Sequence, residues 1–199
     1  MLILGLNGSP HKDGNTAHLL KISLEEASNL GAETRLIHIV DALEGQKDPF
    51  CRQCANPCPG NCARGKPLGE AYDLLRRADG IILGSPVYFG TVSAQLKAFW
   101  DKSRVLRNDK ALLNVVGGGI SVGRIRFGGQ ETTLKTMFDM MLVQGMIVVG
   151  DGCEDSDCGH HGGCGQVPAT GDTFAAERVR CLGRRVAQVA GATSSLRRR

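Results

Sequence analysis

Short apolar runs alternate with stretches of helical periodicity along the chain, and this alternation restricts the fold more than any other feature. Each apolar run is followed by a segment in which apolar residues recur at three- and four-residue spacing, as in an amphipathic helix. The runs are continuously apolar, as expected for strands that are buried on both faces. The repeated strand–helix order therefore predicts an α/β fold, with a parallel sheet and helices on both of its faces.

The chain of 199 residues has the size of one domain, and we expect a single domain over 1–199. The predicted strands are 2–6, 34–40, 80–85, 111–117 and 146–150, and the predicted helices are 15–30, 68–78, 92–105, 131–144 and 172–190. Two long loops, 47–67 and 151–171, are rich in cysteine. Ligands of such sheets bind at the carboxyl ends of the strands, so the loops after the first, third, fourth and fifth strands are the candidate site.

Composition and charge exclude several classes of protein. Hydrophobic residues make up 42%, but no apolar run approaches the roughly 18 residues of a membrane span. The start, MLILGL, has no basic region and is typical of a buried strand rather than a signal peptide, so we expect a cytoplasmic protein with no membrane partner. The formal charge of +4 comes partly from the basic tail 193–199, which we expect to be frayed and solvated and not to bind nucleic acid.

The loop after the first strand, GLNGSPHKDGNT, is a candidate phosphate site. It lacks both the GxGxxG pattern and the GKS or GKT of a P-loop. It offers side-chain donors from Ser9, Asn15 and Thr16 together with backbone N–H groups at a helix start, which suits a phosphate monoester. His11 and Lys12 add positive charge. The alternative is that Ser9 and Asn15 only cap the helix.

The loop after the third strand contains a turn made of a proline and two aromatic residues at a strand end. Its residues are Pro86, Val87, Tyr88, Phe89 and Gly90. Such a turn suits stacking on a planar ring, although it could also pack into the core. A phosphate loop followed two strands later by an aromatic turn favours a ring joined to a phosphate, which describes FMN.

The segments GSPHKDGNT (8–16) and GSPVYFGTVSAQLKAFWDKS (84–103) resemble the NADPH-dependent FMN reductase family, and the resemblance extends through 128–150. It implies a flavodoxin-like three-layer sandwich with a five-stranded parallel sheet in the order 2-1-3-4-5. It also implies that Ser9, His11, Asn15 and Thr16 hold the FMN phosphate and that the turn 86–90 contacts the ring. His11 stands where the family usually has arginine, so either FMN binds more tightly at lower pH or the backbone donors dominate the phosphate contact.

The glycine-rich segment 117–129 is predicted to be a loop beside the flavin. Gly117 and Gly118 would allow the backbone to approach the ring closely. Arg124 and Arg126 are candidates for contacting an acidic partner or a pyridine-nucleotide phosphate, or are simply solvated.

Four of the eight cysteines, Cys51, Cys54, Cys58 and Cys62, fall within one short loop. In a reducing compartment such clusters indicate metal or redox chemistry rather than disulfides. Four thiolates suit a [4Fe–4S] cluster and also tetrahedral zinc, and free thiols remain a third possibility. The position of the loop resembles the cluster loop of the iron–sulfur flavoprotein branch, which implies a [4Fe–4S] cluster. That branch usually has CxxCxxC before the fourth cysteine, whereas this chain has one more residue before the third.

A second sulfur-rich segment spans 150–166 and contains Cys153, Cys158, Cys164, His160 and His161. These side chains could bind a metal, but the resemblance favours a loop near the flavin. Cys181 lies on the apolar face of the last predicted helix and is expected to be a core residue.

These features predict an FMN-dependent oxidoreductase that passes electrons between a reduced donor, FMN and a [4Fe–4S] cluster. The donor would be NAD(P)H or a reduced carrier, and acceptors would be quinones, oxygen species or a ferredoxin-like carrier. The resemblance implies a homodimer or homotetramer. The main alternative is an NAD(P)H-dependent FMN or quinone reductase whose cysteines bind zinc or are free, and a non-catalytic binding module is a third.

Overall fold

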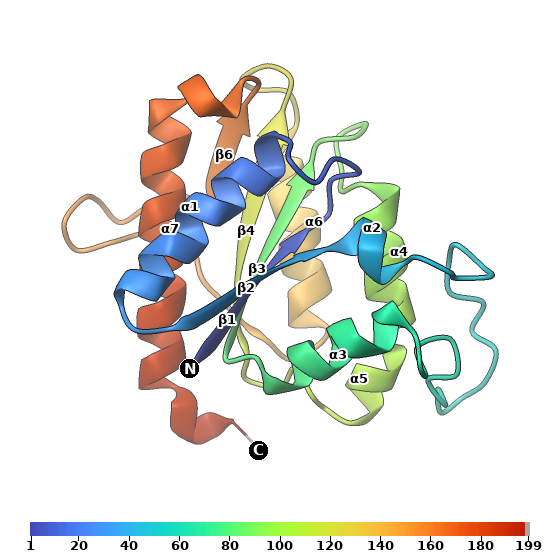
Figure 1. Cartoon of the computed structure of the whole chain (residues 1–199). Helices are drawn as coiled ribbons and strands as arrows, with labels where there is room; N and C mark the ends of the chain where they lie inside the picture. The colour runs from blue at the N-terminus through green and yellow to red at the C-terminus, as the bar shows by residue number, and fades with distance from the viewer. Residues whose placement is uncertain (198–199) are drawn as a thin grey trace.

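A parallel sheet forms the middle layer of the protein in the computed structural model, which describes residues 1–197 (Figure 1). Its strands are β1 (Leu2–Asn7), β2 (Glu33–His38), β3 (Gly80–Pro86), β4 (Val116–Gly123), β5 (Ile147–Val148) and β6 (Gly163–Gln166). The order is β2-β1-β3-β4-β5, with β6 also pairing to β4, and the pairs are parallel. The predicted order 2-1-3-4-5 is therefore confirmed.

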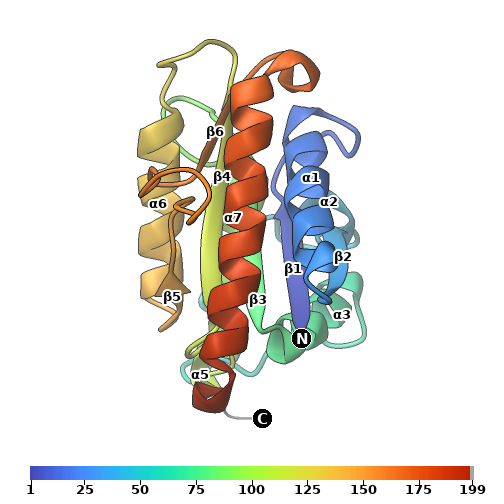
Figure 2. The same cartoon turned by 90° about the vertical axis from the view of Figure 1, so that its left-hand side faces the viewer.

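Helices cover both faces of the sheet, as Figure 2 shows for α6 on one side and for α1 and α7 on the other. One face carries α1 (Asn15–Asn29) and α7 (Thr173–Ala192), whose apolar residues form one core cluster with the sheet. The other face carries α2 (Ile39–Ala42), α3 (Pro67–Arg77), α4 (Ala94–Lys102), α5 (Arg104–Asn108) and α6 (Gln130–Leu142). Short 3-10 helices η1 (Ala169–Gly171) and η2 (Ser194–Leu196) flank α7. The predicted helix 92–105 is thus two helices, α4 and α5.

The fourth strand begins five residues later than predicted, at Val116 instead of 111, and runs to Gly123. Gly117 and Gly118 are consequently strand residues near the amino end of β4, and the prediction that they border the flavin from a loop is wrong. A Cβ at Gly117 would collide with Met141 of α6, and one at Gly118 would lie 2.8 Å from Leu182 of α7. The glycines are there because helices press on both faces of this strand.

The fifth strand is split by an excursion of the chain. The predicted strand 146–150 is reduced to β5, which pairs with the first half of β4. The chain then leaves the sheet and returns as β6, which pairs with the second half of β4. We call residues 149–162 the excursion loop. The predicted loop 151–171 therefore contains a strand that was not expected.

The basic tail is ordered as far as the structure describes it, so its predicted fraying is wrong for Arg197. The Arg197 guanidinium donates hydrogen bonds to the carbonyl oxygens of Ala78 (2.8 Å) and Leu113 (2.8 Å). Residues 198 and 199 lie outside the described residues. Within 1–197, none of the helices is both long enough and apolar enough to cross a bilayer.

Candidate cofactor sites

The loop between β1 and α1 is organised by Asn7, a buried polar residue at the end of an apolar strand. Its Oδ1 accepts the Ser9 N–H at 3.1 Å, and its Nδ2 donates to the His11 carbonyl at 3.1 Å. The same Nδ2 lies 3.0 Å from Nδ1 of His38 at the end of β2. Burial lowers the pKa of His38, which favours the neutral ring that can accept this hydrogen bond. Sequence reasoning missed Asn7, although one polar residue closing an apolar strand was a usable signal.

The amino end of α1 has backbone donors without a side-chain partner. Within the described chain no side chain caps this helix, whose first turn also has no acidic residue. The alternative role of Ser9 and Asn15 as caps is therefore wrong: Ser9 Oγ accepts the His11 N–H at 3.1 Å, and Asn15 Oδ1 accepts the Ala169 N–H at 2.8 Å. Ser9 and Thr16 are buried, while His11 is exposed. A helix start with open N–H groups beside hydroxyls fits an anion.

The Lys12 ammonium group, which the sequence suggested as a positive charge for the phosphate, is paired with a carboxylate. Its Nζ lies 2.7 Å from a carboxylate oxygen of Asp41 in α2, in an exposed ion pair. The hydrogen bond to Asp41 raises the pKa of Lys12. The positive charge next to the phosphate candidate is thus already paired.

Ser93 joins the first and third loops. It caps α4 by accepting the Leu96 N–H at 3.1 Å, and its Oγ donates to the carbonyl of Gly8 at 2.5 Å. Its own N–H donates to Ser85 Oγ at 3.0 Å. Gly8 is required at this contact, because a Cβ there would lie 2.8 Å from both the Gly84 carbonyl and Leu96. Ser93 therefore joins the two candidate loops by hydrogen bonds, and it was not singled out from the sequence.

The aromatic turn lies at the carboxyl end of β3, as predicted. The Val87 N–H donates to the Val122 carbonyl at 2.9 Å, and Tyr88 and Thr91 exchange backbone hydrogen bonds. Phe89 and Gly90 have positive φ values of 51° and 77°, which turns the Phe89 ring fully into solvent. The alternative in which the turn packs into the core is wrong for Tyr88 and Phe89, which are both exposed. An exposed aromatic ring held on a strained turn is a common feature of a binding surface.

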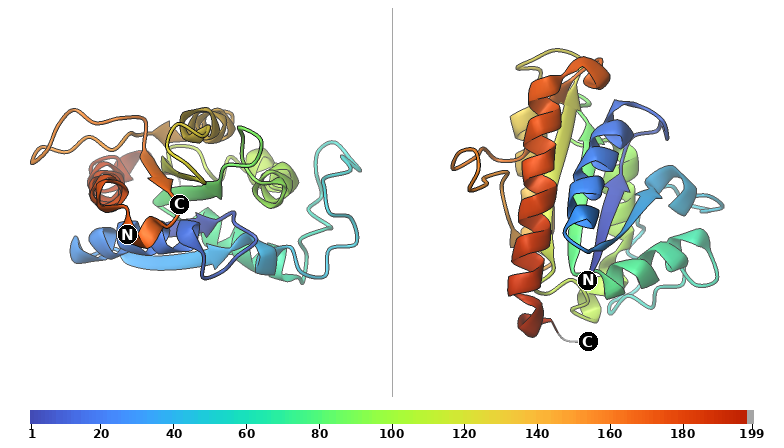
Figure 3. Two further views of the ribbon diagram at one scale, coloured as in Figure 1. Left: turned by 90° about the horizontal axis from the view of Figure 1, so that it is seen from above. Right: turned by 60° about the vertical axis from the view of Figure 1, so that its left-hand side comes forward.

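The loop after β4, residues 124–129, completes this edge of the sheet (Figure 3, left). Gln130 holds it by donating to the Ile125 carbonyl and accepting the Gly128 N–H. Phe127 and Ile125 are exposed, and Arg126 lies 5.9 Å above the ring of Phe174. A cavity of about 600 Å³ lies between this loop and the start of α7, with Arg126, His160, Cys164 and Asp172 among its lining residues.

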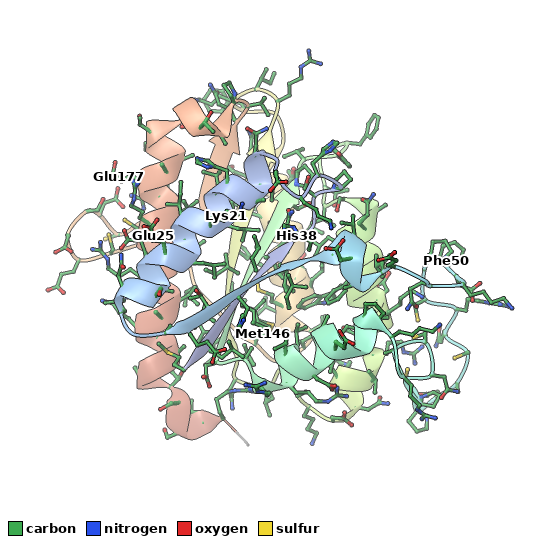
Figure 4. The ribbon with its side chains drawn as sticks, in the orientation of Figure 1. Lys21, Glu25, His38, Phe50, Met146 and Glu177 are labelled. Atoms are coloured by element: carbon green, nitrogen blue, oxygen red, sulfur yellow. The ribbon has the colours of Figure 1, made fainter. Side chains whose placement is uncertain are left out.

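The cysteine loop lies in the segment 43–66, which connects α2 to α3 without helix or strand, and the last residue of the predicted loop 47–67, Pro67, already begins α3. Figure 1 and the left view of Figure 3 show that it projects from the flank that carries α3, α4 and α5, not from the edge where the other loops meet. It is fastened by Gln46, which donates to the Cys62 carbonyl at 3.0 Å, and by Asn108 of α5, which donates to the Cys58 carbonyl at 3.0 Å. In Figure 4, Phe50 marks its outer part and cysteine sulfurs are visible along it.

Cys62 is the thiol of this loop whose surroundings act on it most clearly. Burial raises the pKa of Cys62, the nearby buried Lys102 lowers it, and Cys58 and Cys51 raise it further. Cys54 is exposed. Nowhere in residues 1–197 do three or more His, Cys, Asp or Glu side chains converge in the geometry of a metal-ion site. Four thiols in one loop fit a sulfur-ligated group by their chemistry, but the loop would have to draw its thiols together to bind one.

The excursion loop is tied to α7 through a buried ion pair. Arg178 Nε donates to Asp151 at 2.7 Å, and both side chains are almost fully buried. This pairing raises the pKa of Arg178. His160 and His161 are exposed, and in the described chain no metal-ion site gathers them with Cys153, Cys158 and Cys164. We call the loops after β1, β3 and β4 the flavin-candidate loops. His160 borders the 600 Å³ cavity beside them, whereas the Cys153 thiol lies against Cys181 of α7.

The sheet order and the three converging loops define a flavodoxin-like protein with an additional cysteine loop. Solved structures show the same fold: a flavodoxin-like protein of the WrbA type from Agrobacterium tumefaciens has a TM-score of 0.69 at 21% identity, with 96% of this chain and 97% of that chain covered. An NADH:FMN oxidoreductase in its apo form also has a TM-score of 0.69 at 20% identity, covering 94% of this chain and 88% of the other. At these identities the likeness shows the fold alone.

Sequence comparison shows the family. Residues 1–154 match the NADPH-dependent FMN reductase family. An iron–sulfur flavoprotein of Methanocaldococcus jannaschii is 41% identical over 195 residues, which is 95% of this chain and 97% of the relative. An iron–sulfur flavoprotein of Methanosarcina thermophila is 39% identical over 182 residues, 90% of each chain. The chain belongs to the NADPH-dependent FMN reductase family, within its iron–sulfur flavoprotein branch, as the sequence motifs predicted.

Proposed function

We propose that this protein is an FMN-dependent oxidoreductase that passes electrons between a reduced donor and an acceptor with the help of a [4Fe–4S] cluster held in the cysteine loop. FMN would supply two-electron as well as one-electron exchange, and the cluster one-electron exchange. The observation that carries the proposal is the presence of four cysteines in one flank loop of a flavodoxin-like protein of the FMN reductase family.

The FMN phosphate would lie at the open amino end of α1, where Ser9, His11 and Thr16 surround the backbone N–H groups. Because Asn15 uses Oδ1 to hold Ala169, its Nδ2 group is the donor that would reach the phosphate. The isoalloxazine would contact the turn 86–90, which the Ser93 hydrogen bonds hold in a fixed place relative to the phosphate loop. These residues would bind and orient the FMN, and the proposed mechanism needs no side chain that transfers a proton.

The cluster would be held by Cys51, Cys54, Cys58 and Cys62. Its surroundings are basic: Arg104 and Arg107 line a hollow together with Cys51, and buried Lys102 acts on Cys62. Positive side chains next to the loop stabilise thiolates and suit a cluster whose thiolate ligands give it net negative charge.

The protein would work as a homodimer or homotetramer. The cysteine loop lies on the flank, while the flavin-candidate loops lie at the carboxyl edge of the sheet (Figure 1). Exposed Phe89, Phe127 and Ile125 give that edge an apolar rim of the kind that marks interaction surfaces. In an oligomer, the cysteine loop of one subunit would approach the flavin edge of another.

A second candidate is an NAD(P)H-dependent FMN or quinone reductase whose cysteines bind zinc or are free. It is favoured by the open arrangement of the four thiols, which in residues 1–197 do not form a metal-ion site. A quinone-reducing NAD(P)H dehydrogenase of Chromohalobacter salexigens is also 38% identical, although only over 77 residues, 39% of this chain.

The two candidates are separated by comparing Cys54→Ser with Cys158→Ser under anaerobic purification. Both cysteines are exposed loop residues, so the substitutions are matched in environment. If the loop holds the cluster, Cys54→Ser loses iron and sulfide but keeps FMN, while Cys158→Ser keeps all three. Iron retained at the wild-type level by Cys54→Ser would contradict the proposed ligand set. Bleaching of the flavin absorbance by NADPH, NADH or a reduced carrier then identifies the donor.

A further inference from the structure

The excursion loop is fastened to α7 by charged side chains. Arg178 bridges two loop carboxylates, with Nε 2.7 Å from Asp151 and Nη2 3.1 Å from Asp157. Six residues further along α7, Arg184 lies 2.8 Å from Asp155. These contacts fix the position of the loop against the helix without any covalent bond.

Between these ion pairs a thiol of the loop meets a thiol of the helix. The Sγ atoms of Cys153 and Cys181 are 2.8 Å apart. Cys181 is only 6% exposed and Cys153 is half-buried, so one thiol is accessible from solvent and the other lies behind it. A disulfide joins its sulfurs at about 2.0 Å, so the two atoms need to move by less than about 1 Å to bond.

We propose that Cys153 and Cys181 form a redox-active dithiol, a site at which a small-molecule disulfide reversibly oxidises the protein and links the excursion loop covalently to α7. Cys153, as the accessible thiol, would attack the external disulfide and release one external thiol, leaving a mixed disulfide on Cys153. Cys181 would then attack the Cys153 sulfur and release the second external thiol. Two protein thiols become one disulfide, and one external disulfide becomes two thiols, so electrons and protons balance.

The environment of Cys181 sets the order and the pH dependence of these steps. Burial, and then the hydrogen bond with Cys153, raises the pKa of Cys181 to about 11. Only the thiolate attacks, so formation of the Cys153–Cys181 bond should become faster as the pH is raised. The nearby Arg178 and Arg184 act in the opposite direction and favour the thiolate.

The bond would act on the cavity beside the flavin-candidate loops. Asp151 and His160 belong to the excursion loop and line the cavity of about 600 Å³. Linking Cys153 to α7 holds this wall in place, whereas the reduced loop depends on its ion pairs. Oxidation should therefore increase the hydrogen-exchange protection of residues 152–158.

The test uses the purified, reduced holoprotein, treated with oxidised glutathione, alkylated under denaturing conditions and digested with trypsin. Cleavage after lysine and arginine places Cys153 in the peptide 136–178 and Cys181 in the separate peptide 181–184, so their linkage gives a cross-linked pair visible by mass spectrometry. The matched variants are Cys153→Ser and Cys158→Ser, which change two cysteines of the same loop. A further variant, Cys181→Ala, removes the buried thiol.

We expect the cross-linked pair in the wild type and in Cys158→Ser, but not in Cys153→Ser or Cys181→Ala, and its loss on treatment with a dithiol reductant. In Cys153→Ser, the peptide 181–184 should be recovered fully alkylated. The proposal is overturned if Cys181 of the wild type stays fully alkylated at every glutathione disulfide concentration. It is also overturned if Cys153→Ser still gives the cross-linked pair, because Cys158 or Cys164 would then be the partner.

Discussion

Replacing Ser93 by alanine tests the link between the two flavin-candidate loops. The change removes the hydroxyl that accepts the Leu96 N–H at 3.1 Å and donates to the Gly8 carbonyl at 2.5 Å, all within the buried interior. Loss of a helix cap costs about 1 kcal/mol. A buried carbonyl left without its donor costs about 1–3 kcal/mol more. We therefore expect the free energy of unfolding to fall by about 2–4 kcal/mol, the sum of these two costs.

The assay is urea denaturation of the cofactor-free protein, which separates folding from stabilisation by bound ligand. Ser23→Ala is the matched control: this serine is also fully buried, but its hydroxyl has no hydrogen-bond partner in the described part of the protein. Removing an unpaired buried hydroxyl should leave stability unchanged or increase it. A midpoint of Ser93→Ala within error of both wild type and Ser23→Ala would refute the role given to Ser93. A weaker FMN affinity of Ser93→Ala is expected from the same link.

Two further predictions concern the helix packing and the pH response. Gly183→Ala should destabilise the protein, because the added Cβ would overlap the Ser23 backbone carbonyl. Gly191→Ala, in open space on the same helix, should increase the free energy of unfolding by about 1 kcal/mol. Equal effects of the two substitutions in thermal unfolding would contradict this. Burial lowers the pKa of His38 below 6.5, so the neutral ring stabilises the fold above about pH 6.5 and that contribution is lost as the pH falls through the lowered pKa. Protonated His38 cannot accept the Asn7 hydrogen bond, so unfolding experiments should show a smaller acid loss for His38→Gln than for wild type; identical profiles would refute this.

Most of the strands and helices could be predicted because apolar runs and helical periodicity determine them locally, whereas the strand order 2-1-3-4-5 was implied by the family resemblance. The start of β4 could not be predicted. The segment 111–117 is rich in β-formers and apolar residues, while the actual strand begins with a valine and three glycines. Glycine is unfavourable in strands. These glycines are nevertheless needed, because Met141 and Leu182 leave no room for side chains.

The hydrogen bonds that hold the candidate site together could also not be predicted, although Asn7 at the end of an apolar strand was a signal that could have been used. Asn7, Ser93 and Ala169 act through hydrogen bonds to residues distant in the chain, such as His38, Gly8 and Asn15. Local patterns carry no information about such partners. In contrast, the four cysteines of the flank loop were evident at once, since their spacing is local.

The central claim, that the flank loop holds a [4Fe–4S] cluster in an FMN protein, is tested most directly by metal and sulfide analysis of anaerobically purified wild-type protein alongside its absorbance spectrum. The account predicts about four iron and four sulfide per chain, together with one FMN and a broad absorbance beneath the flavin bands that bleaches on reduction. Flavin bands alone, with no iron or with about one zinc per chain, would contradict it.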